Sequence, residues 1–380
     1  MGYLPDEILT HIFTFLPIKS IIICTPVSKT WKSLIQNPTF ISTHLYHSHN
    51  KNQNLLFLRL SQNDKEVYTL HKEGDLDFTE YTSFDSPFHG PHLQHPHYNG
   101  TCNAQLCLSD DLRYFGNELF LWNPCVGKLL QLPIPHVTFD SRDLSHSSFG
   151  FGFDPKSNDY KVVRILSILR SPSEHGKSRP EVDVYSLSTG EWRMFSASAS
   201  LPPICAIISS GPPAFANGAL HWIAFAYDNK RFVLVFDLGD EVFRQIQLPE
   251  LPSYSVMTVW RVSVYGNSIA GFQFDAESGL RNIWDFWVMK EYGVASSWTK
   301  FSYQCPKLGM YDPLPLGYWR NGEVILLNYG GGMLNYGGGF LSWNPNSQNI
   351  KDLGNFDTFC GSYVESLVLL DKATKGVVTY

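Results

Sequence analysis

The chain has 380 residues, of which 43% are hydrophobic and 14% aromatic, enough to build a packed core rather than a disordered chain. Only 17% of the residues are charged, whereas glycine and proline number 29 and 23, a balance typical of a β-rich fold with many turns. The formal net charge of −6 gives no basis for binding nucleic acid by charge.

The cysteines and the first residues indicate the compartment. The seven cysteines are scattered, odd in number and without a C-x-x-C pair, which favours free thiols over a secreted disulfide framework. Asp6 and Glu7 occupy the place where a signal peptide would carry basic residues. The most apolar run, Ile21–Cys24, is too short to cross a bilayer. We therefore expect a cytoplasmic or nuclear protein, or both, that binds no membrane.

Residues 4–40 predict three short helices. The first begins at Pro5, with acidic residues in its first turn, and ends at Pro17. The second is expected over Ile18–Thr25, and Ser28 can cap the third. Three such helices bury little apolar surface by themselves. The unit is therefore either a small cap on a larger domain or a docking module whose remaining apolar face meets a partner.

Five segments of this unit carry a resemblance to a known family. They share the order, spacing and residue types of the F-box, and they are Leu4–Leu9, Phe15–Ser20, Val27–Trp31, Leu34–Ile35 and Pro38–Phe40. The resemblance implies a three-helix F-box, placed at residues 1–45, which binds a Skp-type adaptor and through it a cullin and a RING subunit. Pro26 departs from the family pattern and would shorten the second helix.

The resemblance also implies which side chains form the adaptor contacts or the core of the motif. These expected adaptor-binding residues are Leu4, Pro5, Ile8, Leu9, Leu16, Pro17, Val27 and Trp31.

From about residue 54 onward the sequence predicts strands separated by turn clusters. The expected strands are Leu55–Leu60, Val67–His71, Glu118–Trp122, Lys161–Ile165, Val182–Tyr185, Ala219–Ala224, Phe232–Phe236, Trp284–Met289, Val324–Leu327 and Phe340–Trp343. Four pairs of strands joined by an Asn, Asp or Ser turn repeat one pattern, at Leu119–Lys128, Val182–Trp192, Val233–Phe243 and Phe340–Gln348. Weaker copies surround Leu70 and Val288.

The spacing of this pattern indicates a propeller. The first strand of each copy ends at residue 70, 122, 185, 236, 288 or 343. These intervals are close to the roughly 50 residues of a kelch blade, except for a wider one that contains the polar stretch Ser171–Pro180. We therefore expect an all-β, kelch-like propeller of about six blades over residues 46–380. Tyr363–Leu370 is the expected closing strand, although the diglycine of true kelch repeats is missing.

A second resemblance covers this region. Six blocks resemble the plant F-box-associated interaction domain, which includes the S-locus F-box group: Gly150–Asp154, Asp159–Arg164, Asn217–Trp222, Phe236–Glu241, Trp287–Gly293 and Ser297–Lys300. One departure is Asp285-Phe286, which we interpret as an insertion or bulge in its strand.

Other constellations give weaker signals. A histidine-rich stretch could bind zinc or copper, but lacks acidic or thiol ligands at suitable spacing, so a solvated loop is favoured; its histidines are His89, His92, His95 and His97. The glycine-rich copies Asn328–Gly332 and Asn335–Gly339 favour turns over a phosphate site, because strands flank them. Nucleophile-elbow, P-loop, zinc-protease and kinase signatures are absent from the sequence. We expect no metal and no cofactor.

Two function classes remain open. In the first, the chain is a non-catalytic substrate receptor of an SCF-type ubiquitin ligase, with the adaptor on the F-box and a target protein on propeller loops. The loops at His89–His97 and Ser171–Pro180 are the leading candidates for target binding. In the second, it is a propeller enzyme or a carbohydrate-binding lectin with a helical appendage. The target would be a pistil ribonuclease if the chain is an S-locus member.

Overall fold

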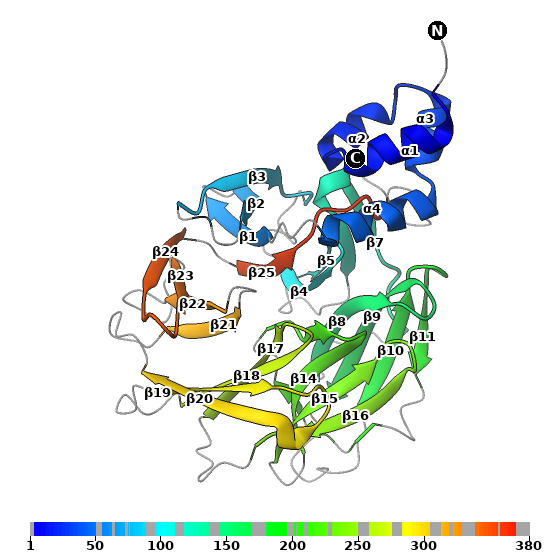
Figure 1. Cartoon of the computed structure of the whole chain (residues 1–380). Helices are drawn as coiled ribbons and strands as arrows, with labels where there is room; N and C mark the ends of the chain where they lie inside the picture. Colours follow the sequence, from blue (N-terminus) through cyan, green and yellow to red (C-terminus); the bar gives the residue numbers. More distant parts are fainter. Residues whose placement is uncertain are drawn as a thin grey trace.

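The computed structural model describes most of the chain. The described residues are 4–50, 55–62, 65–72, 75, 77–88, 96–110, 118–136, 145–168, 180–195, 201–202, 204, 206–208, 211–226, 230–249, 258–275, 283–304, 313–318, 322–328, 339–355 and 358–369. Within them the chain forms a small helical unit followed by a ring of β-sheets (Figure 1).

Four helices form the N-terminal unit: α1 (Asp6–Phe15), α2 (Ile18–Cys24), α3 (Lys29–Ile35) and α4 (Pro38–Asn50). Ser28 caps α3 as expected, because its Oγ accepts a hydrogen bond from Trp31 N at 3.1 Å. The three predicted helices correspond to α1, α2 and α3, and a fourth helix, α4, begins at Pro38 in the last segment of the motif. Pro38 occupies the first turn of α4, where proline is tolerated. Asn37 precedes it, and its Oδ1 accepts from Thr39 N at 2.8 Å.

Six sheets form the blades of the propeller. The strands of each blade are named below from the innermost strand to the outermost. Blade one contains β25 (Thr358–Tyr363), β1 (Leu55–Gln62), β2 (Lys65–Lys72) and β3 (Glu80–Asp85). Blade two contains β4 (His97–Cys102), β5 (Gln105–Ser109), β6 (Leu119–Asn123) and β7 (Lys128–Gln131). Blade three contains β8 (Ser145–Asp154), β9 (Asp159–Ile168), β10 (Glu181–Ser186) and β11 (Glu191–Phe195).

The other three blades follow the same plan. Blade four contains β12 (Ala206–Ile208), β13 (Ala214–Ala216), β14 (Ala219–Phe225), β15 (Arg231–Asp237) and β16 (Val242–Gln247). Blade five contains β17 (Thr258–Tyr265), β18 (Ser268–Asp275), β19 (Ile283–Met289) and β20 (Trp298–Gln304). Blade six contains β21 (Leu314–Tyr318), β22 (Val324–Asn328), β23 (Gly339–Trp343) and β24 (Ile350–Asn355). The prediction of a six-bladed all-β propeller is confirmed.

The sequence repeat corresponds to one position in every blade. Its six marker residues lie in β2, β6, β10, β15, β19 and β23. Each is the third strand of its blade, because β12 and β13 of blade four both pair with β14 and share the first position. All ten predicted strands overlap strands of the structure. The repeated pattern is therefore the hairpin of the third and fourth strands.

The ring is closed by a C-terminal strand, but not by the one predicted. β25 pairs antiparallel with β1, with Leu55 opposite Tyr363 and Phe57 opposite Gly361. The predicted closing strand Tyr363–Leu370 was therefore placed too late, because only Tyr363 belongs to β25. Residues 364–369, here called the C-terminal segment, leave the sheet. Leucine and valine in this segment pack against the helical unit instead of pairing as a strand.

The expectation of an insertion or bulge at Asp285-Phe286 was also wrong. Asp285 pairs with Gln273 on one side and Phe286 pairs with Phe301 on the other, in an unbroken register along β19. Phe286 is fully buried, while Asp285 lies on the opposite face, where its carboxylate bonds Lys300 Nζ at 2.8 Å. The pair therefore follows the ordinary alternation of a strand.

Glycines in β8 let two blades approach closely. A Cβ added at Gly152 would lie 2.5 Å from the ring of Phe215, and one at Gly150 would lie 2.7 Å from Trp222. Both distances are far shorter than van der Waals contact, so any larger residue would force blade three away from blade four. This explains why the Gly150–Asp154 block alternates glycine with aromatic residues.

Because neighbouring strands in each blade are antiparallel, the connections between successive strands lie alternately at the two faces of the propeller. Connections from second to third strand, and from the fourth strand to the next blade, leave at one face, here called the long-connection face. The predicted target loops His89–His97 and Ser171–Pro180 follow β3 and β9 in the sequence, and both strands end at this face, although His97 itself belongs to β4. Most residues of both loops, and of the glycine-rich copies, lie outside the described part of the chain.

Candidate docking surface

Helix α1 carries a stripe of exposed apolar side chains. Leu4, just before the helix, and Ile8, Ile12 and Phe15 within it are between 42% and 52% exposed. Their spacing of three or four residues places them on one side of the helix. Large apolar side chains that stay in contact with water on one helical face are characteristic of an interaction site. This stripe therefore forms the first part of the candidate docking surface.

The other side of the helical unit is buried. Phe13 is 2% exposed and packs edge-on against Trp31, with ring centroids 5.0 Å apart. Ile21 and Ile35 are fully buried in the same cluster. Within the stripe, Phe15 packs edge-on against His47 of α4, with ring centroids 4.7 Å apart, but about half of its surface stays exposed.

Two further exposed apolar side chains lie beyond α1. Ile23, near the end of α2, is 72% exposed, and Val27, between α2 and α3, is 62% exposed. Pro26 precedes Val27, and α2 ends at Cys24, so the departure from the family pattern coincides with an early helix end.

The eight predicted adaptor residues divide into two groups. Five are exposed, as a contact surface requires: Leu4, Pro5, Ile8, Pro17 and Val27. Three are partly buried against the hydrophobic cluster, as the core of a motif requires: Leu9, Leu16 and Trp31. Sequence reasoning missed Ile12, Phe15 and Ile23 as surface residues. Ile12 and Phe15 continue the spacing of Leu4 and Ile8, and that periodicity could have revealed them.

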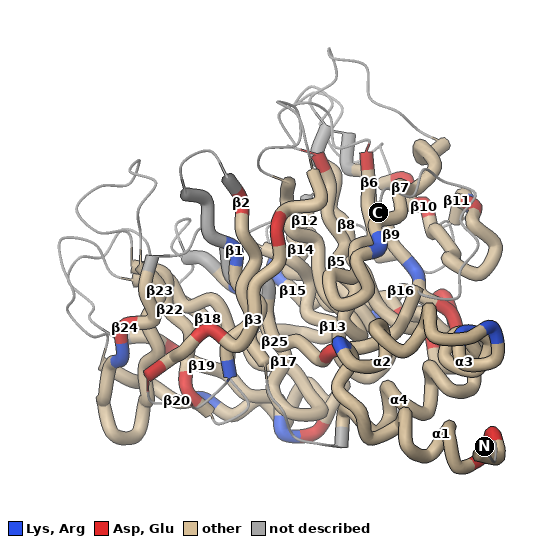
Figure 2. Tube along the Cα trace, turned by 90° about the horizontal axis from the view of Figure 1, so that it is seen from above, with Lys and Arg blue, Asp and Glu red and all other residues tan. Residues whose placement is uncertain are grey.

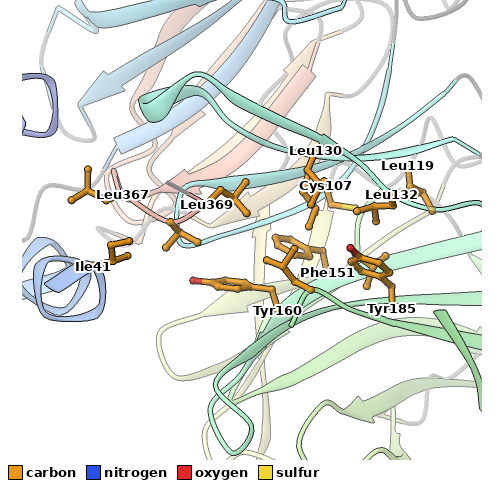
Figure 3. Packing of buried hydrophobic residues seen from close by; sticks show 14 of the residues in the cluster. Ile41, Cys107, Leu119, Leu130, Leu132, Phe151, Tyr160, Tyr185, Leu367 and Leu369 are labelled. Atoms are coloured by element: carbon orange, nitrogen blue, oxygen red, sulfur yellow. The ribbon is translucent and has the colours of Figure 1, made fainter. Parts of the chain in front are cut away.

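The helical unit shares its hydrophobic core with the propeller. Figure 3 shows Leu369 of the C-terminal segment between Ile41 of α4 and the propeller residues Leu130 and Tyr160, with Leu367 near Ile41. All five belong to one continuous cluster of buried side chains. The docking surface is therefore carried by a unit that is packed onto blades two and three.

Polar contacts support the same junction. Lys19 Nζ donates to Thr82 Oγ1 at 2.8 Å, which ties α2 to blade one. His49 Nε2 lies 3.1 Å from Asn103 Oδ1, which ties α4 to the turn between β4 and β5.

The blocks that resemble the F-box-associated domain supply polar contacts between neighbouring blades. Lys161 Nζ bonds Asp154 Oδ2 at 2.9 Å, Glu241 Oε1 at 3.0 Å and the carbonyl of Leu238 at 2.7 Å, which joins blades three and four. Three acceptors around one ammonium compensate the cost of burying it.

A second polar contact joins blades four and five. His221 is fully buried, with Nδ1 2.9 Å from the carbonyl of Ala214 and Nε2 2.8 Å from Tyr292 Oη. Burial lowers the pKa of His221 to about 4, so the ring is neutral at pH 7. These two residues belong to the blocks Asn217–Trp222 and Trp287–Gly293, which therefore supply a contact between blades four and five.

Nothing in the described part of the chain forms a metal centre. Of the histidine-rich stretch, only His97 is described, and its Nδ1 lies 3.2 Å from Asn99 Oδ1. His89, His92 and His95 lie outside the described residues. Among the residues that the structure describes, no group of three or more His, Cys, Asp or Glu is arranged to hold a metal ion.

Charge does not mark out a single surface either. Figure 2 shows acidic and basic residues interspersed along the described chain, on the helical unit as well as on the blades. Within the described ranges, no helix is both long and apolar enough to span a membrane. The exposed apolar side chains of the helical unit remain the clearest interaction feature.

Comparison with known families agrees with this geometry. Residues 3–43 match the F-box domain, and residues 44–336 match the F-box associated beta propeller domain. The chain belongs to the family of F-box proteins with an associated propeller. The F-box match covers α1 to α3, the apolar stripe and the first turns of α4.

Similar proteins from Arabidopsis thaliana extend over most of this F-box protein. F-box protein At3g07870 is 30% identical, over 84% of this chain and 78% of its own length. F-box protein CPR1 is 28% identical, over 86% of this chain and 80% of its own length. Among solved structures, a putative TolB from Agrobacterium tumefaciens aligns at 10% identity with a TM-score of 0.41, over 83% of this chain and 99% of that chain.

Proposed function

We propose that this F-box protein is a substrate receptor of an SCF-type ubiquitin ligase. The single observation that carries the proposal is the exposed apolar stripe of Leu4, Ile8, Ile12 and Phe15 on an otherwise well-packed F-box. Such a stripe suits burial against a Skp-type adaptor, which would bring a cullin and a RING subunit. The F-box would occupy residues 1–45 and the propeller 46–380, although α4 continues beyond residue 45.

The exposed members of the predicted set are the adaptor-contact residues in this proposal. Leu4, Pro5, Ile8, Pro17 and Val27 would touch the adaptor, and Ile12 and Phe15 join them. Leu9, Leu16 and Trp31 would act indirectly, because they are packed into the cluster that holds the helices in place.

The target protein would bind at the long-connection face of the propeller. The helical unit contacts Asn103, in the turn from first to second strand of blade two, which lies at the other face. Adaptor and target would then approach from different sides, so neither would block the other. The receptor itself would be non-catalytic and would act by raising the local concentration of target lysines. Such a complex would operate in the cytoplasm, the nucleus or both.

Co-purification tests this function. The tagged full chain should recover a Skp-type adaptor and a cullin from a plant extract, identified by mass spectrometry. A matched variant, Val27→Asp, places a charge on the docking surface at a site that is 62% exposed, and should lose both partners while remaining folded. Equal recovery of the adaptor by both proteins would contradict the proposal. Recovery of a pistil ribonuclease as target would place the chain in the S-locus group.

A further inference from the structure

The C-terminal segment is bonded to blade two through its backbone. Asn123 Nδ2 donates to the carbonyl of Ser366 at 3.1 Å and to the carbonyl of Val368 at 2.8 Å. Ser366 Oγ donates to the carbonyl of Asn103 at 2.6 Å. Asn123 and Ser366 are both fully buried, so these bonds are shielded from water and hold one path of the backbone.

The side chains of the same segment pack against the helical unit. Leu367, Val368 and Leu369 are at most 7% exposed and lie in the cluster that contains Phe13 and Ile41 of the helices. The segment therefore bonds to blade two and shares one hydrophobic cluster with the F-box and the propeller (Figure 3). Residues near the two ends of the chain meet at this point.

Direct contact between the F-box and blade one is incomplete. A cavity of about 100 Å³ lies between them, lined among others by Leu16, His44, Tyr81 and Glu365. Burial raises the pKa of Glu365, against the opposing charge of Lys19. Beside this cavity, the buried side chains Leu367, Val368 and Leu369 of the C-terminal segment add packing between the F-box and the propeller.

We propose that the C-terminal segment fixes the orientation of the F-box relative to the target-binding face, with Asn123 and Ser366 as positioning residues for ubiquitin transfer. The inference rests on the proposed ligase function. Transfer depends on how lysines are held relative to the ubiquitin-charged enzyme, and orientation can alter such rates by orders of magnitude. Because β25 leads directly into the segment, closure of the ring and placement of the F-box are performed by one stretch of chain.

Two variants separate this role from folding. A chain ending at Tyr363 keeps β25 and the closed ring but lacks the segment, and a chain ending at Leu369 is its matched control. Asn123→Asp is the point variant. In the native chain Asn123 Oδ1 accepts from Cys125 N at 3.0 Å, and the aspartate carboxylate can still accept this hydrogen bond. The aspartate has no donor for the carbonyls of Ser366 and Val368.

The readout requires no known target. Each variant is assembled with a Skp-type adaptor, a cullin and a RING subunit, and the ubiquitinated lysines of the receptor itself are quantified by mass spectrometry. Adaptor affinity should stay within about twofold of the control, because the exposed stripe of α1 is unchanged. The dominant lysines should lose about tenfold in relative rate, and other lysines should gain, in the chain ending at Tyr363. Asn123→Asp should shift the pattern in the same direction.

Outcomes of this experiment are distinguishable. An unchanged lysine pattern in both variants, with adaptor bound, overturns the positioning role. If the chain ending at Tyr363 fails to fold, Asn123→Asp alone decides by the same criterion. Absence of adaptor binding in the control would instead contradict the proposed function.

Discussion

At the scale of single residues, glycine determines how closely two blades can pack. Gly152→Ala places a methyl group 2.5 Å from the ring of Phe215 and 2.8 Å from Leu238. We expect a loss of about 1–3 kcal/mol in the free energy of unfolding, typical of overpacking. Denaturant unfolding measures this change. The double variant with Phe215→Leu should recover part of the loss, and an equal loss in both backgrounds would show that this contact is not the cause.

His221 should make stability depend on pH. The unfolded histidine takes up a proton near pH 6.5, whereas burial keeps the folded pKa at about 4. The unfolded state therefore binds more protons between these values, and folded stability falls as the pH drops from about 6.5 toward 4. The slope approaches about 1.4 kcal/mol per pH unit for one proton. Urea unfolding between pH 7 and 5 should give a flatter profile for His221→Gln; identical slopes would contradict the assignment.

Residue patterns were readable in the sequence, but their causes were not. The alternation of glycine and aromatic residues from Gly150 to Asp154 was visible, whereas its steric reason depends on Phe215 and Trp222 in the next blade. Leu16 and Trp31 belong to the F-box motif, yet only packing distinguishes them from the exposed Ile8 and Val27. A motif specifies which residues matter and leaves open whether they support the fold or contact a partner.

At the scale of elements, α1 has two faces with separate roles. Ile8→Ala removes a side chain that is 46% exposed, so it should weaken adaptor binding by about 2 kcal/mol without changing the unfolding midpoint. Phe13→Ala empties a site that is 2% exposed and should cost about 3–5 kcal/mol of stability. Calorimetric titration measures the affinity of Ile8→Ala for the adaptor, and thermal unfolding measures the stability of both variants. Unaltered affinity of Ile8→Ala would place the adaptor elsewhere.

Element prediction succeeded where side chains alternate and failed where other constraints act. The third strands were found because they are rich in large apolar residues and end in turn residues, as in Leu119–Asn123. The inner strands β4 and β8 were missed since they contain Gly, Asn and Ser, which have low strand propensity. Helix α4 was missed because Pro38 can end one helix or begin the next.

At the scale of the whole molecule, β25 closes the ring. A chain ending at Asn355 lacks β25 and leaves β1 as an unpaired edge, which favours aggregation. The chain ending at Tyr363 retains the strand and should remain soluble. Size-exclusion chromatography with cooperative unfolding as a second measurement compares them. A monomeric, cooperatively folded protein ending at Asn355 would show that closure by β25 is dispensable.

The blade count followed from the period of the repeat, because each blade uses the same hairpin. The exact position of closure did not follow from it. Tyr363–Leu370 has the apolar residues of a strand, but Leu367, Val368 and Leu369 pack in the hydrophobic cluster that contains F-box residues. A long-range contact between the first fifty residues and the last fifteen of the described chain has no local signal in either segment.

The central claim is that the F-box of this protein binds a Skp-type adaptor directly. The purified full chain and a purified Skp-type adaptor should form a single complex of one copy each, measured by size-exclusion chromatography with light scattering. The Val27→Asp protein, with an unchanged unfolding midpoint, should elute separately from the adaptor. Two separate species for the wild-type chain at micromolar concentration would contradict the account.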